Sequence, residues 1–200
     1  MKADPLAFVR QALSAPLAPS SDYDLNPDTI LPKGRKLRPA GVLVPIELRD
    51  GVAQVWLTKR SSALKHHPGQ VAFPGGKQDE DDSDITAAAL REAAEEIGLP
   101  SSHVDVLGHM PSHETVTGFV VTPVVAHVTR RFTPVPETGE VEEVFTVPLT
   151  HLMTPDRFSI QSRRWRGTQR RYYTVPFGPY YVWGATARIL RALAVASEGQ

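Results

Sequence analysis

The segment from Pro74 to Leu99, PGGKQDEDDSDITAAALREAAEEIGL, constrains the fold of this chain more than any other. Its two glycines indicate a turn, and the acidic stretch after them leads into a helix expected to begin between Asp82 and Asp84. Gly98 should end that helix, because glycine readily adopts the left-handed backbone of a helix C-terminus, and Pro100 follows. The sequence therefore predicts a loop that enters a helix with both ends marked.

Three glutamates of this helix are spaced so that they fall on one face: Glu92, Glu95 and Glu96. The opposite face should pack inward, and it consists of Ala87, Leu90, Ala94 and Ile97. Like charges at these spacings repel, and Arg91 alone cannot neutralise three carboxylates. A divalent cation with oxygen ligands would do so, and Mg²⁺ or Mn²⁺ is the natural candidate. The alternative interpretation is a solvated acidic surface.

A second motif, LTKRSSALKHHPGQVAFPGG, runs from Leu57 to Gly76 and ends on the same glycines. A lone histidine is more often structural than functional, but here two histidines and a lysine are clustered just before the expected turn. Their side chains could reach an anionic substrate there. The residues expected to bind substrate are Arg60, Lys65, His67 and Gln70. For Arg60, pairing with an acidic side chain is the alternative.

The two motifs together resemble those of the Nudix family. The glycine Gly76 and the run REAAEEIGL, Arg91 to Leu99, match the Nudix box. Asp82 stands where the box has its first glutamate, and eight residues rather than seven separate it from Arg91. The upstream motif is similar to the signature of Nudix enzymes that hydrolyse coenzyme A. It matches at Leu57, Thr58, Arg60, Ser61, His67, Gly69, Gln70, Phe73, Pro74, Gly75 and Gly76.

The resemblance implies an α/β fold, the Nudix-type α/β/α sandwich with a central mixed β-sheet. It also implies a metal-dependent pyrophosphatase that hydrolyses coenzyme A or acyl-CoA to 4′-phosphopantetheine, or its acyl form, and adenosine 3′,5′-bisphosphate. One alternative is a Nudix pyrophosphatase for another nucleoside diphosphate derivative, such as ADP-ribose or NADH. Another is a non-catalytic Nudix module that binds a nucleotide or RNA. The intact glutamate triplet argues against that module.

The chemistry of a pyrophosphate suggests roles for the acidic residues. Its negative oxygens repel a nucleophile, so an enzyme must neutralise charge, place a water in line with phosphorus and remove its proton. We expect catalytic roles for Glu95, Arg91 and Glu96, and metal ligation by Glu92, Glu96, Glu95 and the Gly76 carbonyl. Glu95 is either a ligand or the general base, and Arg91 orients a glutamate. Because Nudix enzymes differ in their base, Glu140, Glu142 and Glu143 are alternatives.

The rest of the chain reads as an N-terminal helix and Pro-rich arm over 1–37 and a Nudix hydrolase domain over 38–200. Strands are expected at Ala40 to Leu48, Val52 to Arg60, Gln70 to Phe73, Val104 to Met110, Phe119 to Val128 and Val144 to Val147. Pro45 indicates a bend or an edge strand. A Pro- and Glu-rich loop should cover Thr133 to Glu143, a hairpin should turn near Gly167, and a last helix should span Trp183 to Ala196.

Composition limits the partners. Lysine plus arginine and aspartate plus glutamate both number 22, so no global field attracts nucleic acid or a membrane, and a small nucleotide is the expected partner. The run RRWRGTQRRYY, Arg163 to Tyr173, has the mix of arginine and aromatic residues found in single-stranded nucleic-acid binders. The zero net charge instead favours a solvated hairpin or a contact to a substrate phosphate.

Cysteine is absent, which excludes disulfides, thiolate catalysis and cysteine–zinc sites. No apolar stretch approaches the roughly 20 residues that span a bilayer, and the first residues do not resemble a signal peptide. We therefore expect a cytoplasmic location and no membrane partner. A homodimer is compatible with the sequence.

Overall fold

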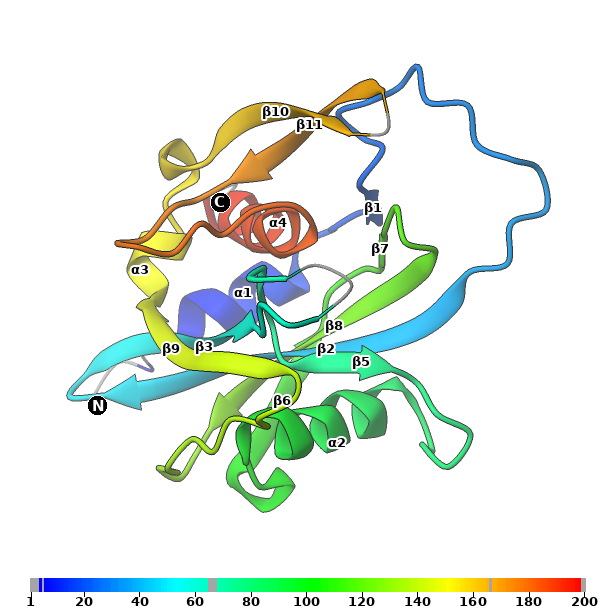
Figure 1. The fold of residues 1–200 in the computed structure, drawn as a ribbon. Coiled ribbons are helices and arrows are strands. Elements are labelled where there is room, and N and C mark those ends of the chain that lie inside the picture. Colours follow the sequence, from blue (N-terminus) through cyan, green and yellow to red (C-terminus); the bar gives the residue numbers. More distant parts are fainter. Residues whose placement is uncertain (1–3, 5, 65–67, 166, 199–200) are drawn as a thin grey trace.

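A large mixed sheet forms the centre of the computed structural model, which describes residues 4, 6–64, 68–165 and 167–198. Within these residues the sheet has nine strands, and a separate two-stranded hairpin lies apart from it (Figure 1). Helices cover both faces of the sheet (Figure 1). The predicted α/β architecture with a central mixed sheet is therefore confirmed.

The strand β2, Arg38–Arg49, lies inside the sheet and organises it. It pairs in parallel with β8, Phe119–Val128, and in antiparallel with β3, Val52–Arg60. The remaining strands are β1 (Ser20–Ser21), β4 (Val71–Ala72), β5 (Gly75–Lys77), β6 (Val104–His109), β7 (His113–Glu114) and β9 (Val141–Pro148). The β2–β3 hairpin was predicted from its turn residues, and Asp50 and Gly51 indeed have positive φ there.

Pro45 is not at an edge, so the edge alternative of that expectation was wrong. On one side of β2, residue 45 pairs with β8. On the other side, β2 pairs with β5 over residues 40–42 and with β3 over residues 46–49. Residue 45 falls in the gap between these two ladders, where a missing backbone donor costs no ladder hydrogen bond.

Two further segments differ from the predictions. Gly75 and Gly76 do not form a turn but belong to β5, which pairs with β2. A Cβ on Gly75 would overlap the backbone of Gly41 and Val42, so glycine is required for this close approach between strands. The predicted loop up to Glu143 is also too long, because β9 begins at Val141.

The helix α2, Ile85–Ile97, covers one face of the sheet. The other face carries α1 (Ala7–Ser14), α3 (Leu149–Leu152) and α4 (Ala185–Glu198). The short helical turn η1 (Ser101–His103) contacts α2, and η2 (Pro155–Arg157) contacts α3 and α4. Neighbouring residues of β2 serve the two faces, since Leu43 packs in the α2 core and Val44 in the larger core beneath α1 and α4.

The hairpin of β10 (Ser159–Trp165) and β11 (Thr168–Thr174) lies over α4, on the side away from the sheet (Figure 1). It turns at Gly167, as predicted. The N-terminal segment reaches the sheet through β1, which pairs with β7. None of the described helices is long and apolar enough to cross a membrane.

Candidate active site

The two ends of α2 lie where the sequence predicted them, and Asp84 and Gly98 cap them. The Asp84 carboxylate accepts a hydrogen bond of 2.8 Å from the Ala87 N–H, which satisfies one free donor of the first turn. At the other end, Gly98 has φ of 69° and its N–H caps the carbonyls of Ala93 and Ala94. The helix therefore has a defined length and a fixed position after the acidic loop.

The buried face of α2 is rotated relative to the predicted one. Its buried residues are Ala88, Ala89, Ala93, Glu96 and Ile97. Ala94, expected to face inward, is exposed, and Ala87 and Leu90 are only half-buried. The cause is Gly41 of β2, because a Cβ at this residue would overlap the Ile85 carbonyl and crowd Ala89. Glycine at this position lets the helix approach β2 through Ala89, and this orientation carries Glu96 into the interior.

Glu96 is a buried carboxylate, with only 5% of its surface exposed. Its Oε2 accepts a hydrogen bond of 3.1 Å from the Gly75 N–H, and its Oε1 lies 3.9 Å from Nη1 of Arg60. Burial raises the Glu96 pKa to about 7, with the nearby Glu92 adding to the shift and the Gly75 and Arg60 contacts opposing it. The charged form is therefore under-compensated by the protein itself.

Glu92 lies beside the same pair of glycines. A Cβ on Gly76 would overlap its carboxylate, so the absence of a side chain at residue 76 makes room for it. Nη1 of Arg91 donates a 3.1 Å hydrogen bond to Glu92 Oε1, yet burial still raises the Glu92 pKa. Glu92 and Glu96 thus flank Gly75 and Gly76, and both would gain from a cation.

Arg91 ties the helix to the acidic loop. Its Nε and Nη2 donate to the two oxygens of Asp82 at 3.0 and 2.9 Å, and Nη2 also donates to the Lys77 carbonyl at 3.2 Å. These hydrogen bonds lower the Asp82 pKa and raise that of Arg91. Asp82, whose role the sequence left open, therefore anchors Arg91. Its position nine residues before Arg91 was the available signal.

Glu95 differs from the other two glutamates of the triplet. Its side chain is 58% exposed, and its Oε2 accepts a 3.1 Å hydrogen bond from the same Arg91 Nη1 that binds Glu92. The structure therefore places Glu95 at the solvent side of the cluster, with Arg91 between Glu95 and the buried pair.

The donor set suits a divalent cation, although the described residues contain no ready-made group of three His, Asp or Glu side chains that could hold one. Glu92 and Glu96 supply hard oxygen ligands on either side of a backbone without side chains. Burial raises the pKa of both carboxylates, so a bound cation would stabilise their charged forms. These residues therefore fit Mg²⁺ or Mn²⁺.

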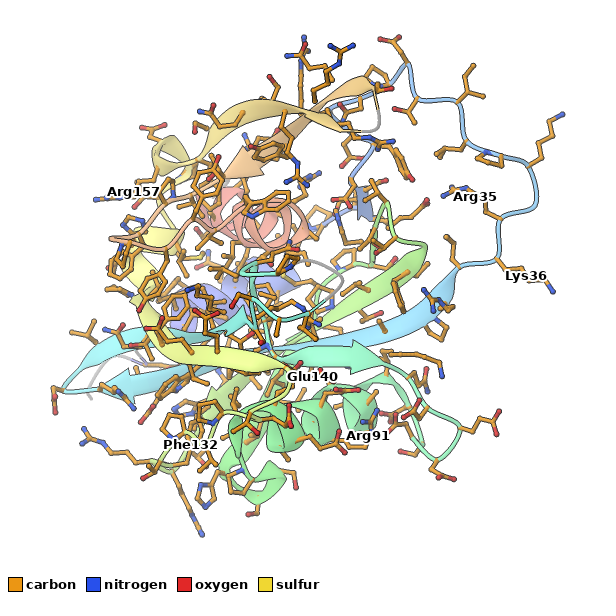
Figure 2. The ribbon with its side chains drawn as sticks, viewed as in Figure 1. Arg35, Lys36, Arg91, Phe132, Glu140 and Arg157 are labelled. Atoms are coloured by element: carbon orange, nitrogen blue, oxygen red, sulfur yellow. The ribbon has the colours of Figure 1, made fainter. Side chains whose placement is uncertain are left out.

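The three alternative bases have different surroundings. Glu140 precedes β9, and Figure 2 shows it above α2, the helix that carries Arg91. Its charge raises the pKa of both Glu92 and Glu96, and none of the described residues pairs with its carboxylate. Glu142 instead binds Lys59 at 2.6 Å, and Glu143 accepts a hydrogen bond from the Tyr180 hydroxyl.

The predicted substrate contacts are only partly described. Lys65 and His67 lie outside the described residues. Arg60 is near Glu96, and its N–H donates a 2.9 Å hydrogen bond to the Gln70 carbonyl. The Gln70 amide nitrogen lies 3.7 Å from the position that a Cβ on Gly184 would take. Arg60 and Gln70 therefore connect the buried carboxylates with the start of α4.

Comparisons with known proteins show which family this chain resembles. The NUDIX domain family model matches residues 37–169. An uncharacterized Nudix hydrolase NudL from Enterobacter sp. (strain 638) is 39% identical over 184 residues, covering 86% of this chain and 95% of the relative. The NudL of Klebsiella pneumoniae (strain 342) is 40% identical over 186 residues, covering 88% of this chain and 96% of its own.

One solved structure illustrates the shared fold. The MutT/nudix family protein from Enterococcus faecalis superposes with a TM-score of 0.50 at 14% identity. The match covers 83% of this chain and 64% of that protein. At this identity the likeness concerns the fold alone.

Proposed function

This chain belongs to the Nudix hydrolase family, and on that premise we propose that it hydrolyses the pyrophosphate bond of coenzyme A or acyl-CoA. The products would be 4′-phosphopantetheine, or its acyl form, and adenosine 3′,5′-bisphosphate. The observation that carries the proposal is the buried Glu96 carboxylate. It accepts a hydrogen bond from the Gly75 N–H, and burial, together with the nearby Glu92, raises its pKa. The likeness of Leu57 to Gly76 to the coenzyme A signature supports the substrate.

Glu92 and Glu96 would hold Mg²⁺ or Mn²⁺, with the Gly76 carbonyl as a further ligand. The ion, when bound, neutralises the pyrophosphate oxygens and makes a bound water more acidic. Arg91 keeps Glu92 in place through its hydrogen bond and is itself held by Asp82. Arg60, 3.9 Å from Glu96, is positioned to meet a substrate phosphate as well.

The general base is proposed to be Glu140, with Glu95 as the second choice. No described residue pairs with the Glu140 carboxylate, whereas Glu95 is bound to Arg91. In the reaction, the base takes a proton from water as the water oxygen bonds to phosphorus and the bridging P–O bond breaks. Replacing Glu140 by Gln should lower kcat by about a hundredfold if it is the base, in line with the usual range for general bases. The same loss in Glu95→Gln, but not in Glu140→Gln, would reverse the assignment.

The two alternatives differ from this proposal in substrate or in turnover. ADP-ribose and NADH present the same pyrophosphate to the same carboxylates, so the buried pair alone does not separate them from coenzyme A. A binding module without turnover would have no use for Glu96, since burying a carboxylate whose charge is only partly compensated destabilises a protein. The buried position of Glu96 therefore favours an enzyme.

A product assay tests the proposal. Purified protein is incubated with Mg²⁺ or Mn²⁺ and, separately, coenzyme A, ADP-ribose, NADH and capped RNA, in ¹⁸O-water, and the products are identified by mass. We expect 4′-phosphopantetheine and adenosine 3′,5′-bisphosphate, one of them carrying a single ¹⁸O, and almost no product from Glu96→Gln. Intact coenzyme A alongside turnover of another substrate would contradict the choice of substrate. Binding without turnover of any of them would favour the module.

The setting of the reaction completes the proposal. We place the enzyme in the cytoplasm, acting on a small nucleotide, and we propose a homodimer. Cell fractionation tests the location, and light scattering on the purified protein tests the assembly. A monomer at micromolar concentration would contradict the dimer.

A further inference from the structure

One face of the β10–β11 hairpin gathers aromatic rings next to an arginine. The register pairs Gln161 with Tyr172 and Arg163 with Arg170, so the side chains of these four residues share a face. Tyr172 packs against Trp183 with ring centroids 5.1 Å apart, and its hydroxyl lies 3.5 Å from that of Tyr181. We call Tyr172, Tyr181 and Trp183 the ring cluster.

Arg163 lies over this ring cluster. Its guanidinium is 4.2 Å from the centre of the Trp183 ring, and the side chain is exposed. No acidic side chain in the described part of the chain forms an ion pair with Arg163. Arg170 stands directly opposite on the partner strand, and its guanidinium lies 5.9 Å from the centre of the Tyr23 ring. An anion at this face would pair with the exposed guanidinium of Arg163.

The ring cluster is connected to the active site through a short series of contacts. Trp183 precedes Gly184, and the Gln70 amide nitrogen lies 3.7 Å from the position of a Gly184 Cβ. Gln70 in turn accepts the hydrogen bond from Arg60, the residue 3.9 Å from Glu96. Gln70 and Arg60 therefore connect Glu96 with the residue that follows Trp183, and a substrate bound at both places would pass along them.

We propose that Arg163 and the ring cluster bind the phosphorylated nucleoside end of the substrate. The adenine base packs against the rings, and Arg163 binds the 3′-phosphate. This inference rests on the proposed function for the identity of the substrate. It assigns the other end of the molecule, the pantetheine arm, to a different part of the surface.

The chemistry of the site favours this end of the substrate. Aromatic rings offer flat faces on which a base stacks, and a guanidinium matches the oxygens of a phosphate. The pantetheine arm is flexible and uncharged, and therefore offers neither a flat ring to the aromatic faces nor an anion to Arg163. The nucleic-acid alternative calls for several cations that follow a backbone, whereas this face offers an arginine pair beside one set of rings.

The test uses a matched pair of substitutions in the whole protein. Arg163→Gln removes the charge from the proposed face, and Arg164→Gln removes the same charge from the neighbouring residue, whose side chain lies on the other face. The probes are adenosine 3′,5′-bisphosphate and adenosine 5′-monophosphate, and binding is measured by calorimetry. Arg163→Gln should weaken binding of the bisphosphate about tenfold, as expected for one charge-assisted contact, and should leave the monophosphate unchanged. Arg164→Gln should change neither.

The ring cluster has its own readout. Adenosine 3′,5′-bisphosphate should quench tryptophan fluorescence in the wild-type protein, and Trp183→Phe should lose most of the quenching while keeping its melting temperature. No binding of the bisphosphate at millimolar concentration, equal losses in the two arginine variants, or unchanged quenching in Trp183→Phe would each overturn the proposal. The proposal would also be overturned if single-stranded RNA bound more tightly than the bisphosphate and its binding depended equally on Arg163 and Arg164.

The outcome can be separated from that of the proposed function. If coenzyme A is hydrolysed, Arg163→Gln should lower kcat/KM for coenzyme A about tenfold, and leave that for coenzyme A without its 3′-phosphate unchanged. If Arg163→Gln hydrolyses coenzyme A as fast as wild type, this inference is wrong and the proposed function stands. If the bisphosphate binds in a way that depends on Arg163 but coenzyme A is not hydrolysed, the proposed substrate is wrong and the binding site stands.

Discussion

At the scale of single residues, the site depends on a carboxylate that the fold keeps away from water. Among the described residues, Glu96 receives only the Gly75 N–H as a close partner, with Arg60 more distant at 3.9 Å. The pattern of glutamates in the sequence predicted that a cation would be needed. It did not predict that Glu96 and Glu92 would be partly withdrawn from water while Glu95 stays 58% exposed, because that division depends on how α2 sits on the sheet.

The raised pKa of Glu96 predicts how pH affects the stability of the metal-free protein. The folded-state pKa is about 7 and the ordinary value is 4.5, so the folded protein holds a proton that the unfolded chain releases. Stability is therefore lost as pH rises from about 4.5 through about 7, by up to about 3 kcal/mol. In urea denaturation with EDTA present, Glu96→Gln should be more stable than wild type at pH 8. At pH 5 its advantage over wild type should be much smaller. The same difference at both pH values would contradict a buried, charged Glu96.

Asp82 provides a second test at this scale. Asp82→Asn replaces one of the two oxygens that bind Arg91 by an NH₂ donor and removes the negative charge, so Arg91 is held less firmly and in turn holds Glu92 less firmly. Asp82→Asn should lower kcat by about tenfold with little change in KM, because Asp82 acts through Arg91 rather than on substrate. Asp81→Asn is the matched control, since Asp81 is exposed, and it should behave like wild type. Equal effects of the two variants would argue against the anchoring role.

At the scale of elements, local signals predicted the ends of α2 and the two hairpins. Asp84, Gly98 and Gly167 act within a few residues of themselves, so their effects can be read from the sequence. The misjudged features all depend on a distant partner. Gly75 pairs with β2 rather than turning, and Ala94 points outward because Gly41 admits Ala89 instead. Neither contact leaves a local mark in the sequence.

The rotation of α2 can be tested with a pair of substitutions in one helix. Ala89 is fully buried against β2, and Ala94 is exposed. Ala89→Leu should lower the free energy of unfolding by about 1–3 kcal/mol through overpacking. Ala94→Leu should change it by less than about 0.5 kcal/mol, as is usual for surface positions. Chemical denaturation measures both, and a larger loss from Ala94→Leu would restore the face predicted from the helical wheel.

At the scale of the whole molecule, the N-terminal segment is attached to the domain through buried polar contacts. His113 is fully buried, and its ring lies 2.9 Å from the Ser20 hydroxyl and 3.1 Å from Asp22. Asp22 also accepts a 2.9 Å hydrogen bond from the Val116 N–H. The sequence predicted an arm over residues 1–37 but no partner for it, because these contacts join residues about ninety positions apart.

Removing the Asp22 side chain tests this attachment. Asp22→Ala removes the partner of His113 Nε2 and of the Val116 N–H, and should lower the free energy of unfolding by about 1–3 kcal/mol. Asp28→Ala is the control, because Asp28 is exposed in the same segment, and it should be neutral. Limited proteolysis should cut the segment before residue 38 faster in Asp22→Ala than in Asp28→Ala. Identical cleavage would show that Asp22 does not hold the segment.

The proposed reaction requires a divalent ion between two side chains of one helix. The most direct measurement is the anomalous difference density of a crystal soaked in Mn²⁺ with a non-hydrolysable coenzyme A analogue. We predict a peak bound by carboxylate oxygens of both Glu92 and Glu96, beside the analogue's pyrophosphate, and no peak there in Glu96→Gln. A manganese peak that touches neither glutamate, or an analogue bound with no metal near Gly75 and Gly76, would contradict it.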